Sequence, residues 1–184
     1  MNLKNEKCQI EIKIDETYTV ESTDNKYYDI IFNPNNYTHN DLYTVFSIEI
    51  DLFNKQYSIA LVGDYYSYNT DCALLDNTVL TVLQNDTITQ IDIIDKKIVN
   101  RIKFNCFGCN FGIYKIQTGY VIYGEIEITM LDMDFNKKWS FSGKDIFVST
   151  TNKMPFKLKE NSICLYDFQD NYYEINFNGQ LINK

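Results

Sequence analysis

The chain has 184 residues, of which 45% are apolar and 15% aromatic, and it carries a formal net charge of −8 at pH 7. This length fits one globular domain that buries a large core without metals or disulfides. The acidic charge disfavours nucleic acid as a direct partner, and the sequence lacks the run of about 18 apolar residues that a membrane-spanning helix requires.

The N-terminal segment predicts a strand rather than a targeting signal. Residues 1–7 have no apolar stretch or small-residue cleavage site, and residues 8–14 alternate apolar and polar side chains. The five cysteines are scattered through apolar stretches. An odd number of cysteines without a signal peptide favours a reduced, cytoplasmic protein in which several cysteines are ordinary core residues.

Strand patterns continue along the chain. Apolar and polar side chains also alternate in residues 28–32, 46–52 and 173–177. Each alternation predicts a strand with one packed face and one wet face. No comparably long stretch keeps the i, i+3, i+4 rhythm of a helix, so little or no helix is expected.

A short phrase recurs four times: an apolar residue, Asp or Asn, a few residues, and then Asx–Lys or Asn–Gly. It begins at Ile50, Ile91, Leu131 and Ile175, in steps of 41, 40 and 44 residues. Asn and Asp suit tight turns because they tolerate left-handed backbone and bond their own chain. With three or four short apolar runs in each period, the pattern indicates modular β units of propeller-blade size.

We therefore expect a single all-β domain over residues 1–184. Residues 1–45 would supply divergent N-terminal strands, either as outer strands of the first unit or as a cap. Residues 46–184 would form four antiparallel strand–turn–strand units, arranged as a small β-propeller-like ring or as an open meander folded into a two-sheet sandwich. A slip in apolar parity within residues 128–133 predicts a β-bulge.

In the third unit, six residues separate Leu131 and Asp132 from Trp139. This turn resembles that of PQQ-type β-propeller repeats, which are relatives of the WD repeat. The resemblance covers residues 46–184 and implies propeller architecture. The Thr-Gly usual before the lysine is absent, only one unit has the tryptophan, and four units are fewer than in quinone-binding enzymes, so no cofactor is expected. The whole chain also resembles small bacterial proteins of the toxin-immunity kind.

Side chains for catalysis or metal binding are sparse. His39, the only histidine, lies in a polar loop and is interpreted as exposed. Residues 132–136 match the opening D-x-D-x-N of a calcium loop, but Lys137 stands where such a loop needs glycine, so a hairpin turn is favoured and no metal is expected.

Cys106-Phe107-Gly108-Cys109 is a CxxC motif without a second ligand pair for zinc. Because it falls between two strand patterns, we interpret it as structural cysteines in a turn that connects two blades. A reversible disulfide between these cysteines stays open as an alternative.

Glu125 and Glu127 flank Ile126 and are expected on one face of a strand, with Trp139 as a potential aromatic neighbour. Paired carboxylates beside an aromatic ring could bind or hydrolyse a carbohydrate. Alternation places both carboxylates on the solvent face, where acids are common for other reasons.

Tyrosine is the more distinctive feature, with fifteen in the chain. Residues 63–71 form a loop of Tyr, Ser, Asn and Asp, a mixture typical of recognition loops. The alternative is a solvated loop whose tyrosines cover neighbouring strands. The predicted contact residues are Asp64, Tyr65, Tyr66, Tyr68 and Asp71.

These features favour a non-enzymatic, cytoplasmic module that binds a basic protein partner, in its sharper form an immunity-type inhibitor of a basic toxin domain. One alternative is a small-molecule or carbohydrate binder or hydrolase that uses Glu125 and Glu127. Another is a structural scaffold without a site.

Overall fold

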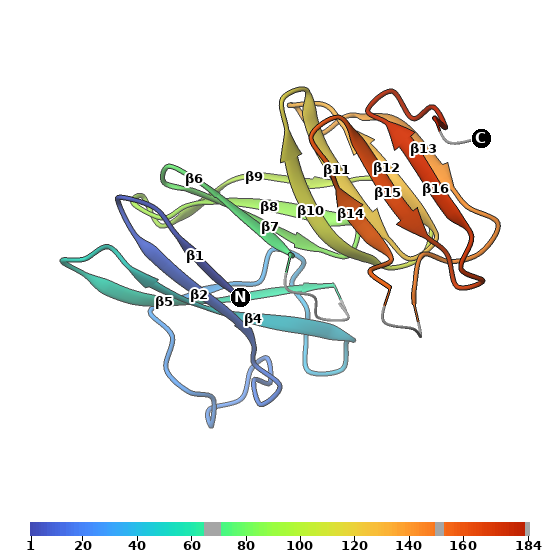
Figure 1. The fold of residues 1–184 in the computed structure, drawn as a ribbon. Coiled ribbons are helices and arrows are strands. Elements are labelled where there is room, and N and C mark those ends of the chain that lie inside the picture. The colour runs from blue at the N-terminus through green and yellow to red at the C-terminus, as the bar shows by residue number, and fades with distance from the viewer. Residues whose placement is uncertain (65–70, 150–152, 183–184) are drawn as a thin grey trace. The chain divides into compact units, whose positions relative to one another are not determined.

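The computed structural model describes residues 1–64, 71–149 and 153–182, and these residues form strands, turns and loops without a helix. They group into two compact units, Met1–Lys103 and Phe104–Lys184. Each unit contains two sheets, as the strand labels in Figure 1 show. The prediction of an all-β chain of repeated sheet units is confirmed, whereas the prediction of one domain over 1–184 stays a prediction.

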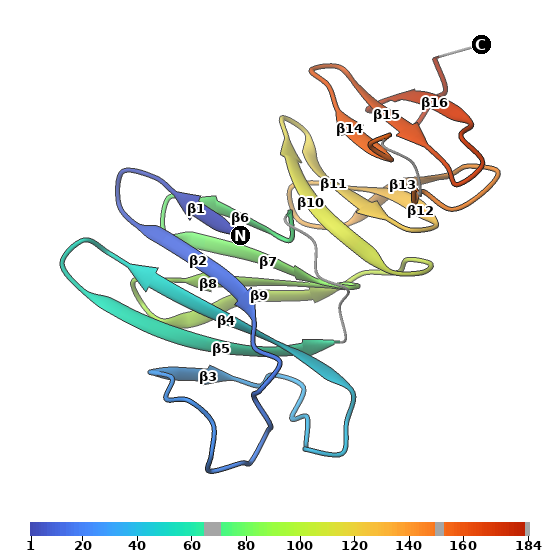
Figure 2. The same cartoon turned by 60° about the horizontal axis from the view of Figure 1, so that its bottom comes forward.

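The first sheet of the first unit, sheet A, has the strand order β1-β2-β4-β5-β3. All neighbours are antiparallel except β3 and β5, which run parallel with Ile30 opposite Ile59 and Phe32 opposite Leu61. The N-terminal residues thus supply strands of the first sheet, one of the two predicted possibilities (Figure 2). The strands are β1 (Asn2–Lys4), β2 (Gln9–Ile14), β3 (Ile30–Phe32), β4 (Tyr43–Asp51) and β5 (Gln56–Asp64).

Sheet B completes the first unit with the order β6-β7-β8-β9. The apolar faces of sheets A and B share one core, in which Ile48 and Ile59 of sheet A pack with Leu80 and Ile91 of sheet B. The other face of sheet A is partly covered by the segment between β2 and β4, through a cluster that includes Val20 and Val62. The strands of sheet B are β6 (Ala73–Asp76), β7 (Val79–Gln84), β8 (Thr87–Asp92) and β9 (Lys97–Lys103).

The second unit contains sheet C, with the order β10-β11-β12-β13, and sheet D, with the order β14-β15-β16. Its core joins Val121 and Ile128 of sheet C to Ile163 and Ile175 of sheet D, together with Phe147 from the connection. The strands are β10 (Asn110–Ile116), β11 (Gly119–Gly124), β12 (Glu127–Leu131), β13 (Lys137–Ser142), β14 (Phe156–Leu158), β15 (Ser162–Tyr166) and β16 (Tyr172–Asn176).

The recurring Asx phrase forms a turn in every sheet, following β4, β8, β12 and β16, and the turns of the third and fourth sheets share one hydrogen-bond pattern. In the third unit, the backbone N–H groups of Asp134 and Asn136 donate to Asp132 Oδ1 at 3.0 and 2.8 Å. Because the carboxylate binds N–H groups of its own turn, the leading Asx fixes the loop conformation. The leading residues are Asp51, Asp92, Asp132 and Asn176.

The residues with left-handed backbone in these turns differ from expectation. They are Phe53 (φ 66°), Lys96 (φ 57°), Phe135 (φ 64°) and Gly179 (φ 77°), so only the fourth turn uses a residue suited to this conformation. A non-glycine residue with this φ brings its Cβ close to the backbone. The Asx residues therefore act as hydrogen-bond acceptors in these turns, and other residues bear the strain.

The predicted β-bulge is confirmed. The pairing of β12 with β13 shifts between Met130 and Leu131, where Met130 lies opposite Trp139 and Leu131 lies opposite Lys137. Lys138 is the extra residue that the shift leaves on β13. The apolar parity slips in this part of the sequence because β12 is buried at every position, on both of its faces, while the extra residue lies on the partner strand β13.

Candidate functional site

The predicted recognition loop lies mostly outside the described residues, including Tyr65, Tyr66 and Tyr68. Asp64, at the end of β5, is described, and its carboxylate accepts a hydrogen bond from the Tyr37 hydroxyl. Lys103 Nζ lies 3.7 Å from the same carboxylate. Asp64 therefore belongs to a polar network within the first unit, while Asp71 directly precedes the core residue Cys72.

Electrostatics support this role for Asp64. Partial burial opposes its ionisation, but hydrogen bonds, including that from Tyr37, and the nearby Lys103 and Arg101 hold the pKa of Asp64 below its ordinary value. Lys103 also pairs with Asp86 at 3.1 Å. Much of the negative charge of Asp64 is thus compensated inside the molecule.

A more strongly acidic surface lies on sheet A, at a cavity of about 400 Å³. We call it the acidic groove and define it by Glu11, Asp29, Glu49 and Asp51. Glu11 and Glu49 are direct cross-strand neighbours on β2 and β4. Like charges directly opposite each other destabilise a sheet, so the opposition of these two carboxylates does not itself favour folding.

Three nearby lysines compensate part of the groove's charge: together with the Ser58 hydrogen bonds, Lys96 helps to lower the pKa of Asp29, and two others pair with the glutamates. Lys13 lies 2.8 Å from Glu11, and Lys26 lies 3.5 Å from Glu49. The hydrogen bond from Lys13 holds the pKa of Glu11 below its ordinary value, so this carboxylate is ionised at neutral pH. Asp29 is fixed by the Ser58 backbone N–H, which donates to it at 2.8 Å. The groove is therefore a concave surface lined by four carboxylates, which nearby lysines compensate only in part.

The expectation for Glu125 and Glu127 is wrong in one respect. Glu127 is 3% exposed and lies on β12, not on a wet face, whereas Glu125 precedes the strand and is half-buried. Lys137 Nζ approaches Glu127 Oε1 to 3.0 Å, and the Phe107 backbone N–H donates to the same oxygen at 3.2 Å. Burial opposes ionisation, but the bonds from Lys137 and Ser140 hold the pKa of Glu127 below its ordinary value.

Trp139 does not join these carboxylates. It lies opposite Met130, whereas Glu127 lies opposite Ser142, three positions further along β13. Because side chains alternate between the faces of a sheet, Trp139 and Glu127 project from opposite faces of sheet C. Neither Glu125 nor Glu127 lines the acidic groove or the cavity beside Trp139. The carboxylate pair is a structural feature of the second unit.

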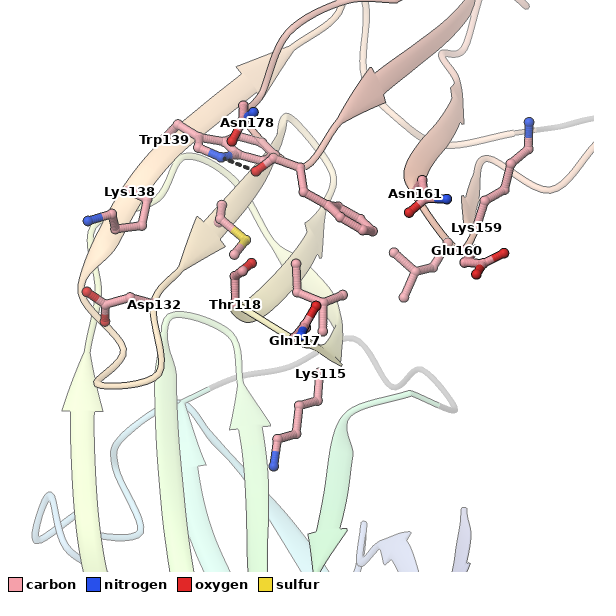
Figure 3. Close-up of a pocket in the computed structure, with 14 residues that line it drawn as sticks. Lys115, Gln117, Thr118, Asp132, Lys138, Trp139, Lys159, Glu160, Asn161 and Asn178 are labelled. Carbon is pink, nitrogen blue, oxygen red and sulfur yellow. Dashed lines mark hydrogen bonds between the residues drawn. The ribbon is translucent and has the colours of Figure 1, made fainter.

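Trp139 instead lines a cavity of about 690 Å³ within the second unit, which we call the inter-sheet pocket. Its walls come from both sheets of this unit, and Figure 3 shows Trp139 and Lys138 on one side with Lys159 and Asn161 on the other. The indole N–H donates to the Phe177 carbonyl at 3.0 Å. This hydrogen bond fixes the orientation of the ring in the wall. The sequence indicated Trp139, but it did not indicate the pocket.

The structure also describes His39, the single histidine. His39 is exposed and contacts Glu21 at 3.1 Å.

The CxxC motif lies in the connection between β9 and β10, as expected, but the Cys109 side chain is exposed, so core packing does not account for it. All five cysteines are free thiols. Within the described residues, no helix is long and apolar enough to cross a membrane, and no group of three or more His, Cys, Asp or Glu side chains is placed to hold a metal ion.

No protein-family model matches the chain, and no curated protein matches it by sequence. The fold, however, is similar to solved structures. BamB from Moraxella catarrhalis, a PQQ-like β-propeller, superposes with a TM-score of 0.52 at 8% identity, over 77% of this chain and 45% of BamB. Hsv2 from Kluyveromyces lactis, also a β-propeller, gives a TM-score of 0.46 at 8% identity, over 76% of this chain and 46% of Hsv2.

The likeness to BamB supports propeller-type sheets and nothing beyond the fold. The chain spans less than half the length of either structure.

Proposed function

We propose that the protein is a binding module that recognises a basic region of a partner protein through the acidic groove of its first unit. The observation that carries the proposal is the direct opposition of Glu11 and Glu49 at a concave surface. A cationic side chain placed between these carboxylates would relieve their repulsion on binding. Asp29 and Asp51 add two further carboxylates to this surface, so a partner with several basic residues fits best.

Propeller-type sheets support this role because rigid strands hold the groove side chains in fixed positions. The loop of residues 64–71 belongs to the proposal as a second contact region, with Tyr65, Tyr66 and Tyr68 as aromatic anchors beside Asp64 and Asp71. The sharper form of the proposal is an immunity-type inhibitor that blocks a basic toxin domain. A cytoplasmic setting is proposed with it, and five free thiols are compatible with reducing conditions.

The test is affinity capture from the native host with three forms of the protein. The groove variant carries Glu11→Gln and Glu49→Gln, and the control carries Glu6→Gln and Glu160→Gln, which change two exposed carboxylates outside the groove. We expect the wild type and the control to retain the same basic protein, with binding that weakens as salt rises, and the groove variant to lose it. Retention by the groove variant equal to that of the control, or a partner without a basic surface, would falsify the proposal.

The immunity form needs a separate measurement. A captured partner that is toxic when expressed alone, and harmless when expressed with the wild type, supports it. Co-expression with the groove variant should then restore toxicity, whereas continued protection would show that inhibition does not depend on the groove.

A further inference from the structure

The CxxC motif differs from the other cysteines in its exposure. Cys8, Cys72 and Cys164 are buried, whereas Cys106 is partly exposed and Cys109 is exposed. Buried cysteines contribute to a core as small apolar side chains, but the more exposed pair gains little from packing. Two cysteines are also only half of the ligands of a structural zinc site, and among the described residues no third such side chain joins them. Neither packing nor metal binding therefore explains this motif.

The backbone of the motif suits a disulfide between its two ends. The chain bends at Phe107 and Gly108, between the two cysteines. Gly108 has φ 72°, close to the left-handed value of the third residue of a type II turn. A four-residue turn brings the Cα atoms of its first and fourth residues within about 7 Å, and a disulfide spans a Cα separation of about 4.4 to 6.8 Å. In this motif the first and fourth residues are Cys106 and Cys109.

Strands of sheet C fix the backbone around Cys106. Lys137 Nζ donates to the Asn105 carbonyl at 3.1 Å, directly before this cysteine. The Phe107 N–H, directly after it, donates to Glu127 Oε1 at 3.2 Å. Lys137 and Glu127 form an ion pair with each other at 3.0 Å. The ion pair therefore holds the bend at two points, one on each side of Cys106.

The other end of the motif is held as well. The Glu125 N–H donates to the Cys109 carbonyl at 2.7 Å. Gly108 lies so close to the same segment that an added Cβ would approach Ile126 Cγ1 to 2.8 Å. Because the backbone is fixed at both cysteines, little further conformational entropy is lost when a disulfide closes between them.

The two sulfurs have different surroundings. Asn110 is only 1% exposed, and its Nδ2 donates to Cys106 Sγ at 3.0 Å. This bond holds the Cys106 sulfur toward a buried amide, whereas Cys109 is accessible to a reagent in solution. An incoming disulfide therefore meets Cys109 first.

We propose that Cys106 and Cys109 form a thiol–disulfide exchange site whose substrate is a low-molecular-weight disulfide. The Cys109 thiolate attacks one sulfur of the substrate, which forms a mixed disulfide and releases a first thiolate. The Cys106 thiolate then attacks the Cys109 sulfur, which forms the intramolecular disulfide and releases a second thiolate. The two protons lost by the cysteines pass to the two released thiolates, so the substrate is reduced to two thiols while the cysteine pair is oxidised. This site lies in the second unit and is independent of the acidic groove.

The test is equilibration of the whole chain with mixtures of glutathione and glutathione disulfide in the absence of air, followed by acid quenching, alkylation and mass spectrometry. We expect Cys106 and Cys109 to escape alkylation together, in an intramolecular disulfide that dithiothreitol returns to the dithiol. Closing this disulfide releases two molecules of glutathione, so the equilibrium depends on the square of the glutathione concentration. A tenfold increase of both forms at a constant ratio should therefore lower the ratio of oxidised to reduced protein by about tenfold.

Single substitutions test the two roles. Cys106→Ser should trap a mixed disulfide with glutathione at Cys109, because no second thiol displaces it. In Cys109→Ser, Cys106 should stay unmodified over the time in which Cys106→Ser reacts. The control is Cys164→Ser, which removes a buried cysteine of the same unit and should oxidise as the wild type does.

The proposal is wrong if both cysteines are still alkylated after the most oxidising mixture. It is also wrong if the oxidised fraction depends only on the ratio of the two glutathione forms, which would indicate a mixed disulfide, or if glutathione modifies Cys106 before Cys109. None of these outcomes bears on capture of a basic partner by the acidic groove.

Discussion

Lys137 Nζ lies 3.0 Å from Glu127 Oε1, and the pair joins neighbouring strands of sheet C with the Glu127 side chain only 4% exposed. Lys137 also donates to the Asn105 carbonyl at 3.1 Å, so the same ammonium ties the strand to the connection that precedes β10. A carboxylate at this depth is stable in its ionised form only because these partners are present.

Removal of the ammonium should therefore destabilise the protein. We expect Lys137→Met to lower the free energy of unfolding by about 2 kcal/mol, because Glu127 is left buried without its cation. The adjacent Lys138→Met is the control, since Lys138 is also exposed but is not the partner of Glu127. Urea denaturation measures both. If the two variants lose the same stability, the ion pair makes no specific contribution.

Glu174 should govern part of the acid stability. It accepts hydrogen bonds from Ser162 at 2.6 Å, Lys159 at 2.9 Å and Tyr172 at 2.8 Å, and these bonds lower the pKa of Glu174 to about 2. The folded state thus favours the ionised carboxylate. Its contribution to stability is complete above the pKa of about 4.3 of an unfolded glutamate and is lost as pH falls toward about 2.

Glu174→Gln should flatten the dependence of unfolding free energy on pH between about 4.3 and 2, by up to one proton in the slope. The measurement is urea unfolding at a series of pH values in this range. Glu160→Gln, at an exposed carboxylate of the same unit, serves as the control. A slope identical in both variants would contradict the assignment.

The strained turn of the first unit offers a stabilising change. Phe53 is 57% exposed and has φ 66°, so its side chain gains little from burial while its backbone is strained. We expect Phe53→Gly to raise the free energy of unfolding by about 1 kcal/mol, since glycine adopts this conformation without a Cβ clash. Phe53→Ala keeps the clash and should give no such gain. Thermal and urea unfolding distinguish the two variants.

Thiol reactivity should follow burial. Cys109 is exposed, whereas Cys72 is fully buried and burial raises the pKa of its thiol to about 11. In the native protein we expect a thiol-specific chromogenic disulfide to react rapidly with Cys109 and not with Cys72. Cys109→Ser should abolish the fast phase, and Cys72→Ser should leave it intact. A fast phase that survives Cys109→Ser would show that another thiol is accessible.

The sequence predicts the strands and turns well because their signals are local. Alternation marks the strands, the leading Asx residues mark the turns, and the parity slip, which arises from burial on both faces of β12, coincides with the bulge after Met130. The left-handed residues are not predictable in this way, because Phe53 and Phe135 have no preference for that conformation and are placed there by the bonds to Asp51 and Asp132.

The candidate sites depend on contacts between distant residues, and alternation does not reveal these. Glu127 has the pattern of a solvent-facing acid, but Lys137 from the next strand neutralises it in the interior. Glu11 and Glu49 are ordinary polar positions until the register of β2 and β4 brings them face to face. The sequence predicts that Asp64 contacts a partner. It does not reveal the hydrogen bond from Tyr37, because Tyr37 lies 27 residues earlier in the chain.

The parallel pairing of β3 with β5 has a consequence for the order of folding. A hairpin forms between β4 and β5 from nearby residues, but β3 cannot form its ladder until β5 is in place, and that ladder spans only Ile30 to Phe32. The segment between β2 and β4, which contains β3, should therefore dock last and open first. The amide hydrogens of this segment would exchange with solvent through local opening. Those of β4 would exchange only when the whole unit unfolds.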